Sequence, residues 1–155
     1  MAGRLPLLAC ALLLCAACTP VRSAIAPPYA LRGQTYDETQ IRELARRQCV
    51  DSAHEQPEHV FTTDGCSFWP DGEWRECCIE HDLFYWCGGA TEERRKADSG
   101  LRACVAGHSS DFNAGLMYWG VRLGGNRWLP FTWRWGYGHD WPYAPPKSAP
   151  SVPQP

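Results

Sequence analysis

Residues 77–87 read CCIEHDLFYWC, and Gly88-Gly89 follows them directly. A glycine pair is typical of the C-terminal end of a helix, so we predict a helix from about Glu73 to Trp86. We predict a second helix from about Thr91, which is its expected N-cap, to Ala106. The connection between them is so short that the two helices must run antiparallel.

The register of this helix pair follows from its short turn. In an antiparallel pair, facing residues have numbers that add to a nearly constant sum, here about 180 because the turn is centred near Ala90. A His and an Asp on facing helices are more often a surface ion pair. Here, however, the facing residues of each helix all lie on one face of that helix. The register predicts three facing pairs: Cys77 with Cys104, His81 with Asp98, and Phe84 with Ala97.

The N-terminus has the features of a secretory signal. Arg4 precedes an apolar run from Leu5 to Ala17, which is too short to cross a bilayer. Two processing sites compete. Cleavage after Ser23 would make residues 1–23 a signal peptide, whereas cleavage before Cys18 would make that cysteine a lipid anchor. We therefore expect an exported protein that is secreted or periplasmic, or else held at a membrane as a lipoprotein.

The chain of 155 residues has room for one domain. We expect residues 24–35 to be a linker and residues 36–141 to form the domain. Residues 142–155 are rich in proline and should be a tail, because this composition buries too little apolar surface to offset its ordering entropy. The net charge of −2 argues against a nucleic-acid partner, and nothing in the sequence identifies a protein partner.

Six cysteines remain unmodified after either cleavage: Cys49, Cys66, Cys77, Cys78, Cys87 and Cys104. An even set in a small exported domain indicates three disulfides, although six cysteines allow fifteen connectivities. A structural zinc site is the alternative, with possible ligands Cys66, Cys77, Cys78 and His81. The adjacent cysteines point in different directions and lack a CxxC spacing, so we favour the disulfides.

Two segments precede the helix pair. Tyr36–Val50 is predicted to be a short amphipathic helix with Asp37 as its N-cap. Residues 54–71 are rich in Pro, Thr, Asp, Gly and Ser and lack a helical period, so they are predicted to form a loop.

His81 and Asp82 are the candidate reactive pair. A neutral imidazole can take a proton from water, and a carboxylate such as Asp98 fixes its tautomer and stabilises its charged form. Asp82 projects about 100° further around the helix, toward the loop. Calcium prefers hard oxygen ligands, and the loop around Asp64, Gly65 and Ser67 offers them.

The stretch CCIEHDLFYWC resembles the signature of the secreted phospholipases A2: paired cysteines, two variable residues, His-Asp, and a Tyr three positions on. The resemblance covers about residues 60–106. It implies that His81 is the catalytic base, that Asp82 is a calcium ligand, and that Asp98 supports His81 together with Tyr85.

The same resemblance bears on the disulfides. It implies a Cys77–Cys104 bond and a Cys66–Cys78 bond, and Cys49 is left to pair with Cys87 by elimination. A further bond of the family would join positions 84 and 97, which here hold a Phe and an Ala. This pair of residues is a sensible packing replacement for a disulfide.

The calcium loop departs from the family. Cys66-Ser67-Phe68-Trp69-Pro70-Asp71-Gly72 replaces a Gly-rich segment and looks more like the bacterial and fungal branch. An aspartate side chain can join the coordination in that branch, and Asp64 is the candidate here.

The resemblance implies a mainly α, small disulfide-linked phospholipase A2-like fold with two antiparallel helices and a calcium loop. It implies calcium-dependent hydrolysis of the sn-2 ester of a glycerophospholipid at a membrane or micelle surface, with Ca²⁺ as cofactor. The alternative is a catalytically silent module on the same scaffold that binds lipid or protein.

The segment from Tyr118 to Tyr143 is unusually rich in Trp and Tyr. Such residues favour the headgroup level of a membrane, but aromatic loops can equally cover the core of a small domain. Within it, FTWRW alternates like an edge strand, with Phe131, Trp133 and Trp135 on one side. Both interpretations remain open at this point.

Overall fold

A computed structural model describes residues 24–52 and 54–145 of the protein. The described part is mainly helical, as predicted, with a short hairpin and four helices: β1 (Tyr29–Leu31), β2 (Gln34–Tyr36), α1 (Glu38–Asp51), α2 (Arg75–Cys87), α3 (Thr91–His108) and α4 (Asp111–Gly124). The predicted signal peptide with Cys18, and residues 146–155 of the predicted tail, lie outside it. None of the described helices combines the length and the apolar character that crossing a membrane requires.

The helix α1 begins where the sequence predicts an N-cap. The Asp37 side chain accepts a hydrogen bond from the Gln40 backbone N–H at 2.8 Å, and the Gln40 side chain accepts one from the Asp37 N–H at 2.9 Å. This capping box satisfies two backbone donors that the helix itself cannot. Three residues of one face, Ile41, Ala45 and Cys49, are buried in the core.

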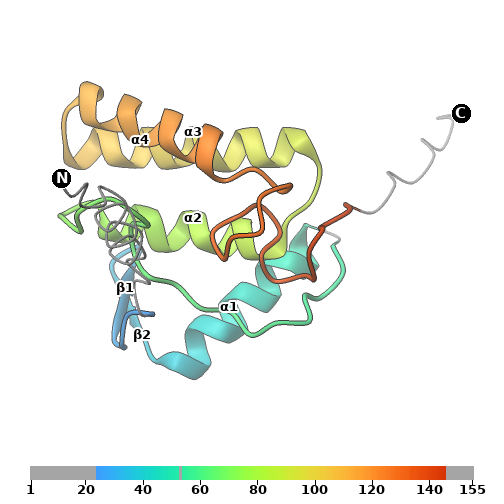
Figure 1. Ribbon diagram of the computed structural model, residues 1–155. Helices are drawn as coiled ribbons and strands as arrows, with labels where there is room; N and C mark the ends of the chain where they lie inside the picture. Colours follow the sequence, from blue (N-terminus) through green and yellow to red (C-terminus); the bar gives the residue numbers. More distant parts are fainter. Residues whose placement is uncertain (1–23, 53, 146–155) are drawn as a thin grey trace, which may run out of the picture.

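The helices α2 and α3 run antiparallel, as predicted, with α2 in the middle of the molecule and α3 beside α4 (Figure 1). Gly88 and Gly89 make the turn with φ of 78° and 122°, values that L side chains rarely adopt. The prediction of Thr91 as N-cap is wrong by one residue. The N-cap is Ala90, because Glu93 reaches back and accepts a hydrogen bond from the Ala90 N–H at 2.7 Å.

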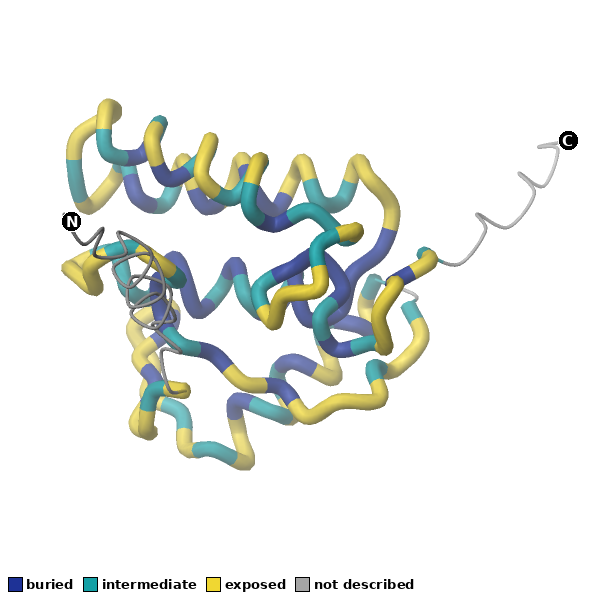
Figure 2. The backbone as a smooth tube through the Cα atoms, viewed as in Figure 1, coloured by how far each residue is buried: buried dark blue, intermediate teal, exposed yellow. Residues whose placement is uncertain are grey.

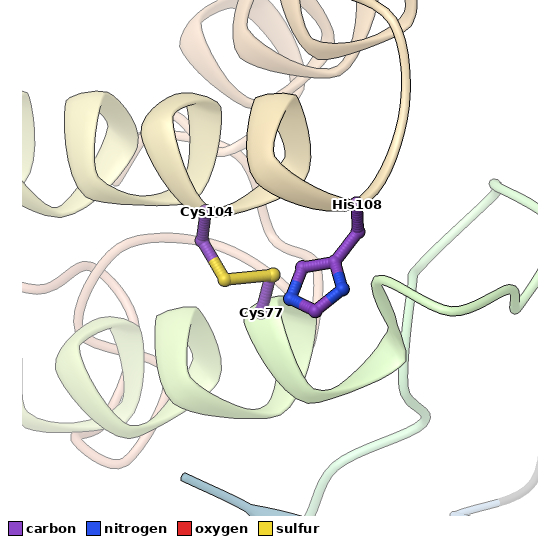
Figure 3. A group of neighbouring side chains, drawn as sticks. All are labelled: Cys77, Cys104 and His108. Carbon is purple, nitrogen blue, oxygen red and sulfur yellow. A yellow bond between two sulfur atoms is a disulfide. The ribbon is translucent and has the colours of Figure 1, made fainter.

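Three disulfides join these elements, and all three predicted pairings are confirmed: Cys49–Cys87, Cys66–Cys78 and Cys77–Cys104. The first ties α1 to the end of α2, and the second ties the preceding loop to the start of α2. The third links α2 to α3 (Figure 3). Each disulfide thus fixes one neighbour of α2, which is the central helix of the fold.

The expectation that residues 24–35 are a linker is wrong. Within them, β1 pairs antiparallel with β2, and Tyr29 and Leu31 are buried. The alternation of Tyr-Ala-Leu places these two side chains on one face of the strand, toward α1 and α2. The turn residues Arg32 and Gly33 have φ of 51° and 71°, as a tight hairpin requires.

The expected boundary between domain and tail is also too early. Tyr143 is buried, and its hydroxyl accepts a hydrogen bond from the Gly89 backbone N–H at 2.7 Å. Trp135 is buried beside it and donates from its indole N–H to the Gly89 carbonyl at 2.9 Å. The folded part therefore extends past residue 141 and covers the α2–α3 turn.

The predicted edge strand at residues 131–135 is absent, because this segment consists of turns and bends. Trp135 and its neighbour Arg134 are both buried, whereas the predicted edge strand would place them on opposite sides, with Arg134 facing solvent. Some residues of the aromatic segment are buried in the core and others are exposed, so each of the two interpretations applies to part of it. Trp135 and Tyr143 belong to the core, whereas the exposed aromatic residues are Trp119, Trp128, Phe131 and Trp141.

The helix α4 is not predicted from the sequence. Its N-cap Ser110 accepts a hydrogen bond from the Asn113 N–H at 3.2 Å, and its buried residues Ala114 and Met117 pack toward α3. It lies on the outside of the molecule, where exposed and buried residues alternate along it (Figure 2). Its inner face completes the wall of the candidate site.

Candidate active site

The site begins with His81 on α2 and Asp98 on α3. The His81 Nε2 lies 2.9 Å from Asp98 Oδ1, and both side chains are buried, with 6% and 0% exposed. They meet because the short turn sets the register of the two helices, so this geometry agrees with the sequence-based pairing. A buried pair of this kind differs from the surface ion pair that is the ordinary alternative.

Asp98 receives two further hydrogen bonds. Tyr85 OH donates to Asp98 Oδ1 at 2.7 Å, and Arg122 Nη1 donates to Asp98 Oδ2 at 2.6 Å. Burial alone would raise the pKa of Asp98, but the hydrogen bond and charge of His81, with the hydrogen bonds from Tyr85 and Arg122, lower it overall. The carboxylate is therefore held in its charged form.

Arg122 is a site residue that the sequence reasoning missed. It comes from α4, outside the segment that carries the resemblance. Arg94 on α3 fixes its position, because the Arg94 guanidinium donates to the backbone carbonyls of Val121 and Arg122 at 2.9 and 2.8 Å. Arg94 also donates to Tyr85 OH at 3.2 Å. The last turn of α4 is thereby attached to the His81–Asp98 pair.

Asp82 turns away from Asp98 and toward the loop, as its position on the helix predicts. Its Oδ2 accepts a hydrogen bond from the Thr63 hydroxyl at 2.6 Å, and the Thr63 hydroxyl oxygen accepts one from the Gly65 N–H at 3.1 Å. Nearby, Asp64 Oδ1 accepts a hydrogen bond from the Ser67 hydroxyl at 2.7 Å. Thr63 is a second residue that the sequence reasoning missed.

The surroundings of the Asp82 side chain disfavour its charged form. Burial raises the pKa of Asp82 well above its usual value, the hydrogen bond from Thr63 opposes the rise, and the negative charge of Asp64 adds to it. A buried carboxylate whose charge is disfavoured in this way is stabilised when a cation lies beside it.

A small cavity of about 80 Å³ joins these acids. Of the four predicted metal ligands, Asp64, Ser67 and Asp82 line it, while Gly65 does not. No lysine, arginine or histidine is among its described lining residues, so neither carboxylate has a basic partner there. Carboxylate and hydroxyl oxygens are the hard donors that calcium prefers, so the residues present fit the predicted calcium ion.

Gly65 serves the conformation of the loop. Its φ is 76°, and a Cβ at this position would come within 2.6 Å of Asp71 Oδ1. Asp71 Oδ1 accepts a hydrogen bond from the Cys66 N–H at 3.1 Å, which holds the loop against the Cys66–Cys78 disulfide. A residue larger than glycine would displace Asp71 and strain the backbone.

A larger cavity of about 310 Å³ opens beside His81 and Asp82. Gly65 and the Cys66–Cys78 disulfide lie on its loop side, and α3 and α4 close the other side. Its walls are mainly apolar and include Trp69, Leu101, Met117, Val121 and Trp133. Gly120 and Gly124 line it without side chains, so the cavity runs close to the α4 backbone. Such a space suits a flexible apolar chain.

The Cys77–Cys104 disulfide and His108 form a separate cluster at the far end of the α2–α3 pair (Figure 3). Its three ligand-type atoms lie within 4.8 Å of one another, but both sulfurs are bonded to each other and cannot bind a metal as thiolates. The same reasoning removes the zinc alternative, because Cys66, Cys77 and Cys78 are all in disulfides.

The chain matches no protein-family model, no curated protein and no solved structure. The buried His81–Asp98 pair, the two-carboxylate cavity and the apolar cavity beside them are therefore the observations on which a function rests.

Proposed function

We propose that the protein is a calcium-dependent hydrolase of the phospholipase A2 type, which cleaves the sn-2 acyl ester of glycerophospholipids. One observation carries the proposal: Asp82 lines both the two-carboxylate cavity and the apolar cavity, and His81 lines the apolar cavity next to it. A proton acceptor, a cation site and space for an acyl chain thus adjoin one another.

His81 supplies the general base. Its Nε2 is engaged by Asp98, which leaves Nδ1 as the nitrogen that takes a proton from a water molecule. Asp98 holds the ring in this orientation and stabilises the imidazolium that forms, while Tyr85 and Arg122 hold Asp98. A water positioned next to a substrate ester would then attack the carbonyl carbon.

Asp82 and Asp64 would hold the calcium ion, with the Ser67 hydroxyl as a third oxygen on the same cavity wall. When bound, the ion polarises the ester carbonyl and stabilises the developing oxyanion. Thr63 orients Asp82 by donating to its Oδ2. Gly65 allows the loop to adopt the conformation that brings Asp64 and Ser67 to this cavity.

The apolar cavity and its surroundings support a lipid as the proposed substrate class. An acyl chain would lie among Trp69, Leu101 and Met117 with its ester near His81. Phe68 is exposed at the edge of this cavity and contacts Trp133 edge-to-face, with ring centroids 4.8 Å apart. Aromatic side chains at such an edge favour a lipid surface. Export by the proposed signal, with or without a lipid anchor at Cys18, would bring the enzyme to such a surface.

Fatty acid release from mixed phospholipid vesicles tests the function. The mature protein should release fatty acid from the sn-2 position, and a calcium chelator should stop the release. If no lipid is hydrolysed although the disulfides are formed and calcium binds, the enzyme proposal is wrong. The altered loop, with Phe68-Trp69-Pro70 in place of glycines, would then favour the silent lipid- or protein-binding module.

Replacing Asp82 by Asn should abolish calcium binding measured by isothermal titration calorimetry, because the amide is a neutral and weaker ligand. The variant should be at least as stable as the natural protein without calcium, because burial and Asp64 disfavour the charge of Asp82. Asp51→Asn is a matched control, since Asp51 is exposed at the end of α1. Unchanged calcium affinity in the Asp82 variant would exclude this site.

Calcium affinity should also depend on pH. The pKa of Asp82 is raised, so as the pH falls its carboxylate is protonated earlier than an ordinary aspartate and the calcium ligand is lost. We expect calcium to bind well at about pH 8 and markedly more weakly at about pH 5.5, where an ordinary aspartate is still charged. Titrations at the two pH values check this, and equal affinities would contradict it.

A further inference from the structure

The outer face of α4 carries an apolar stripe that nothing in the described part of the chain covers. It consists of Phe112, Leu116, Trp119 and Leu123, with exposed fractions of 75%, 44%, 62% and 76%. The opposite face of the helix carries the buried Ala114 and Met117. The stripe therefore points away from α3 and from the candidate active site. An apolar helix face of this kind marks an interaction surface.

The stripe is free of charge along its length. The charged residues of α4 are Asp111 in its first turn and Arg122 near its end. Arg122 donates inward to Asp98 rather than to solvent. A hydrophilic or charged partner would find no complementary group on this face, so its occupant must present an apolar surface of its own.

The spacing of the stripe residues indicates which apolar surface could pack on them. The four residues are separated by four, three and four positions, so the pattern reads the same in both chain directions. Two copies of α4 that pack antiparallel about a two-fold axis place Phe112 opposite Leu123 of the second copy, and Leu116 opposite its Trp119. A two-fold interface requires such self-complementarity. Spacings of three and four residues also form the seam along which helices pack at a small angle.

We propose that the occupant is a second copy of this chain, and that the protein forms a two-fold homodimer through antiparallel α4 helices. Gly115 and Gly120 flank the stripe, and a Cβ at either position would meet nothing within 4 Å, so the two backbones can approach closely. The antiparallel arrangement also places the helix dipoles favourably. This inference does not depend on the proposed enzymatic activity.

The interface should be weak. Burying the eight stripe side chains of two copies removes roughly 1,000 Å² from water, at the lower limit for a specific interface. Sedimentation equilibrium of the mature protein should therefore show a dimer mass at about 100 µM and a growing monomer fraction on dilution. Trp119→Glu should give a monomer at every concentration, because it buries a charge at the centre of the interface. Trp141→Glu removes an exposed Trp outside α4 and should leave the dimer unchanged.

A charge swap tests the register. Phe112→Glu and Leu123→Lys should each weaken the dimer at least tenfold, and the double variant should recover most of that loss, because positions 112 and 123 face each other. The recovery should fade at high salt. The double variant Phe112→Glu, Trp119→Lys introduces the same charges out of register and should show no recovery.

Three results would overturn the proposal: a monomer at all concentrations, assembly beyond a dimer, or equal behaviour of the in-register and out-of-register double variants. Flotation with neutral phospholipid vesicles tests the other possible occupant of the stripe, which is a lipid surface. A monomer that binds vesicles and loses this binding in Trp119→Glu would assign the stripe to a lipid surface instead.

Discussion

His81→Gln is expected to reduce chelator-sensitive fatty acid release by at least about 10³-fold, because glutamine cannot accept the proton of the attacking water. The Gln amide is a hydrogen-bond donor and can still reach Asp98, so the buried carboxylate keeps a partner. The fold should therefore survive, which far-UV circular dichroism and thermal unfolding would show. Release is measured from the sn-2 position of mixed phospholipid vesicles at saturating calcium.

His108→Gln is the matched control for this variant. His108 lies at the end of α3 beside the Cys77–Cys104 disulfide, away from both cavities of the site. It should keep normal release. If His81→Gln keeps near-normal turnover, His81 is not the base and the proposed mechanism fails, whatever the calcium dependence.

Removing the Cys77–Cys104 disulfide by a double Ala substitution should lower the free energy of unfolding by about 3.5 kcal/mol. The bond closes a loop with a sequence separation of 27 residues, and the entropy of this loop in the unfolded chain sets the estimate. It is also the disulfide that joins α2 to α3, so its loss should loosen the His81–Asp98 register. Urea denaturation of the oxidised proteins measures the change.

The Cys66–Cys78 bond is a natural comparison, because its sequence separation is only 12. Its removal by the same substitutions should cost less, about 2.8 kcal/mol. Its effect on calcium affinity should be the larger of the two, since it holds the loop with Asp64 and Ser67. A loss of under about 1 kcal/mol for Cys77–Cys104 would show that the unfolded chain already keeps the two helices together.

The part of the site that could be predicted from the sequence depends on local geometry. A two-glycine turn between two helices fixes which residues face each other, so one rule places both the Cys77–Cys104 bond and the His81–Asp98 contact. The direction of Asp82 follows equally from its angle on α2. These inferences need no knowledge of distant segments.

The parts that could not be predicted depend on contacts between distant segments. Thr63 donates to Asp82 from a loop position 19 residues earlier in the sequence. Arg122 reaches Asp98 from a helix whose position is known only once it has packed on α3. The hairpin before α1 is not predictable from the sequence because its strands have three residues each. Strands this short leave little periodic signal, and burial against α1 and α2 stabilises them.

Asp98 is the meeting point of three helices: it belongs to α3, and it accepts hydrogen bonds from His81 and Tyr85 on α2 and from Arg122 on α4. Local opening of α4 would thus remove the Arg122 guanidinium, which donates a hydrogen bond to this buried carboxylate, and that loss is costly. The last turn of α4 and the middle of α3 should therefore open as one cooperative unit in native-state hydrogen exchange. The carboxylate that orients His81 thus also couples α4 to the rest of the fold, so the chemistry and the resistance to opening are properties of the same buried group.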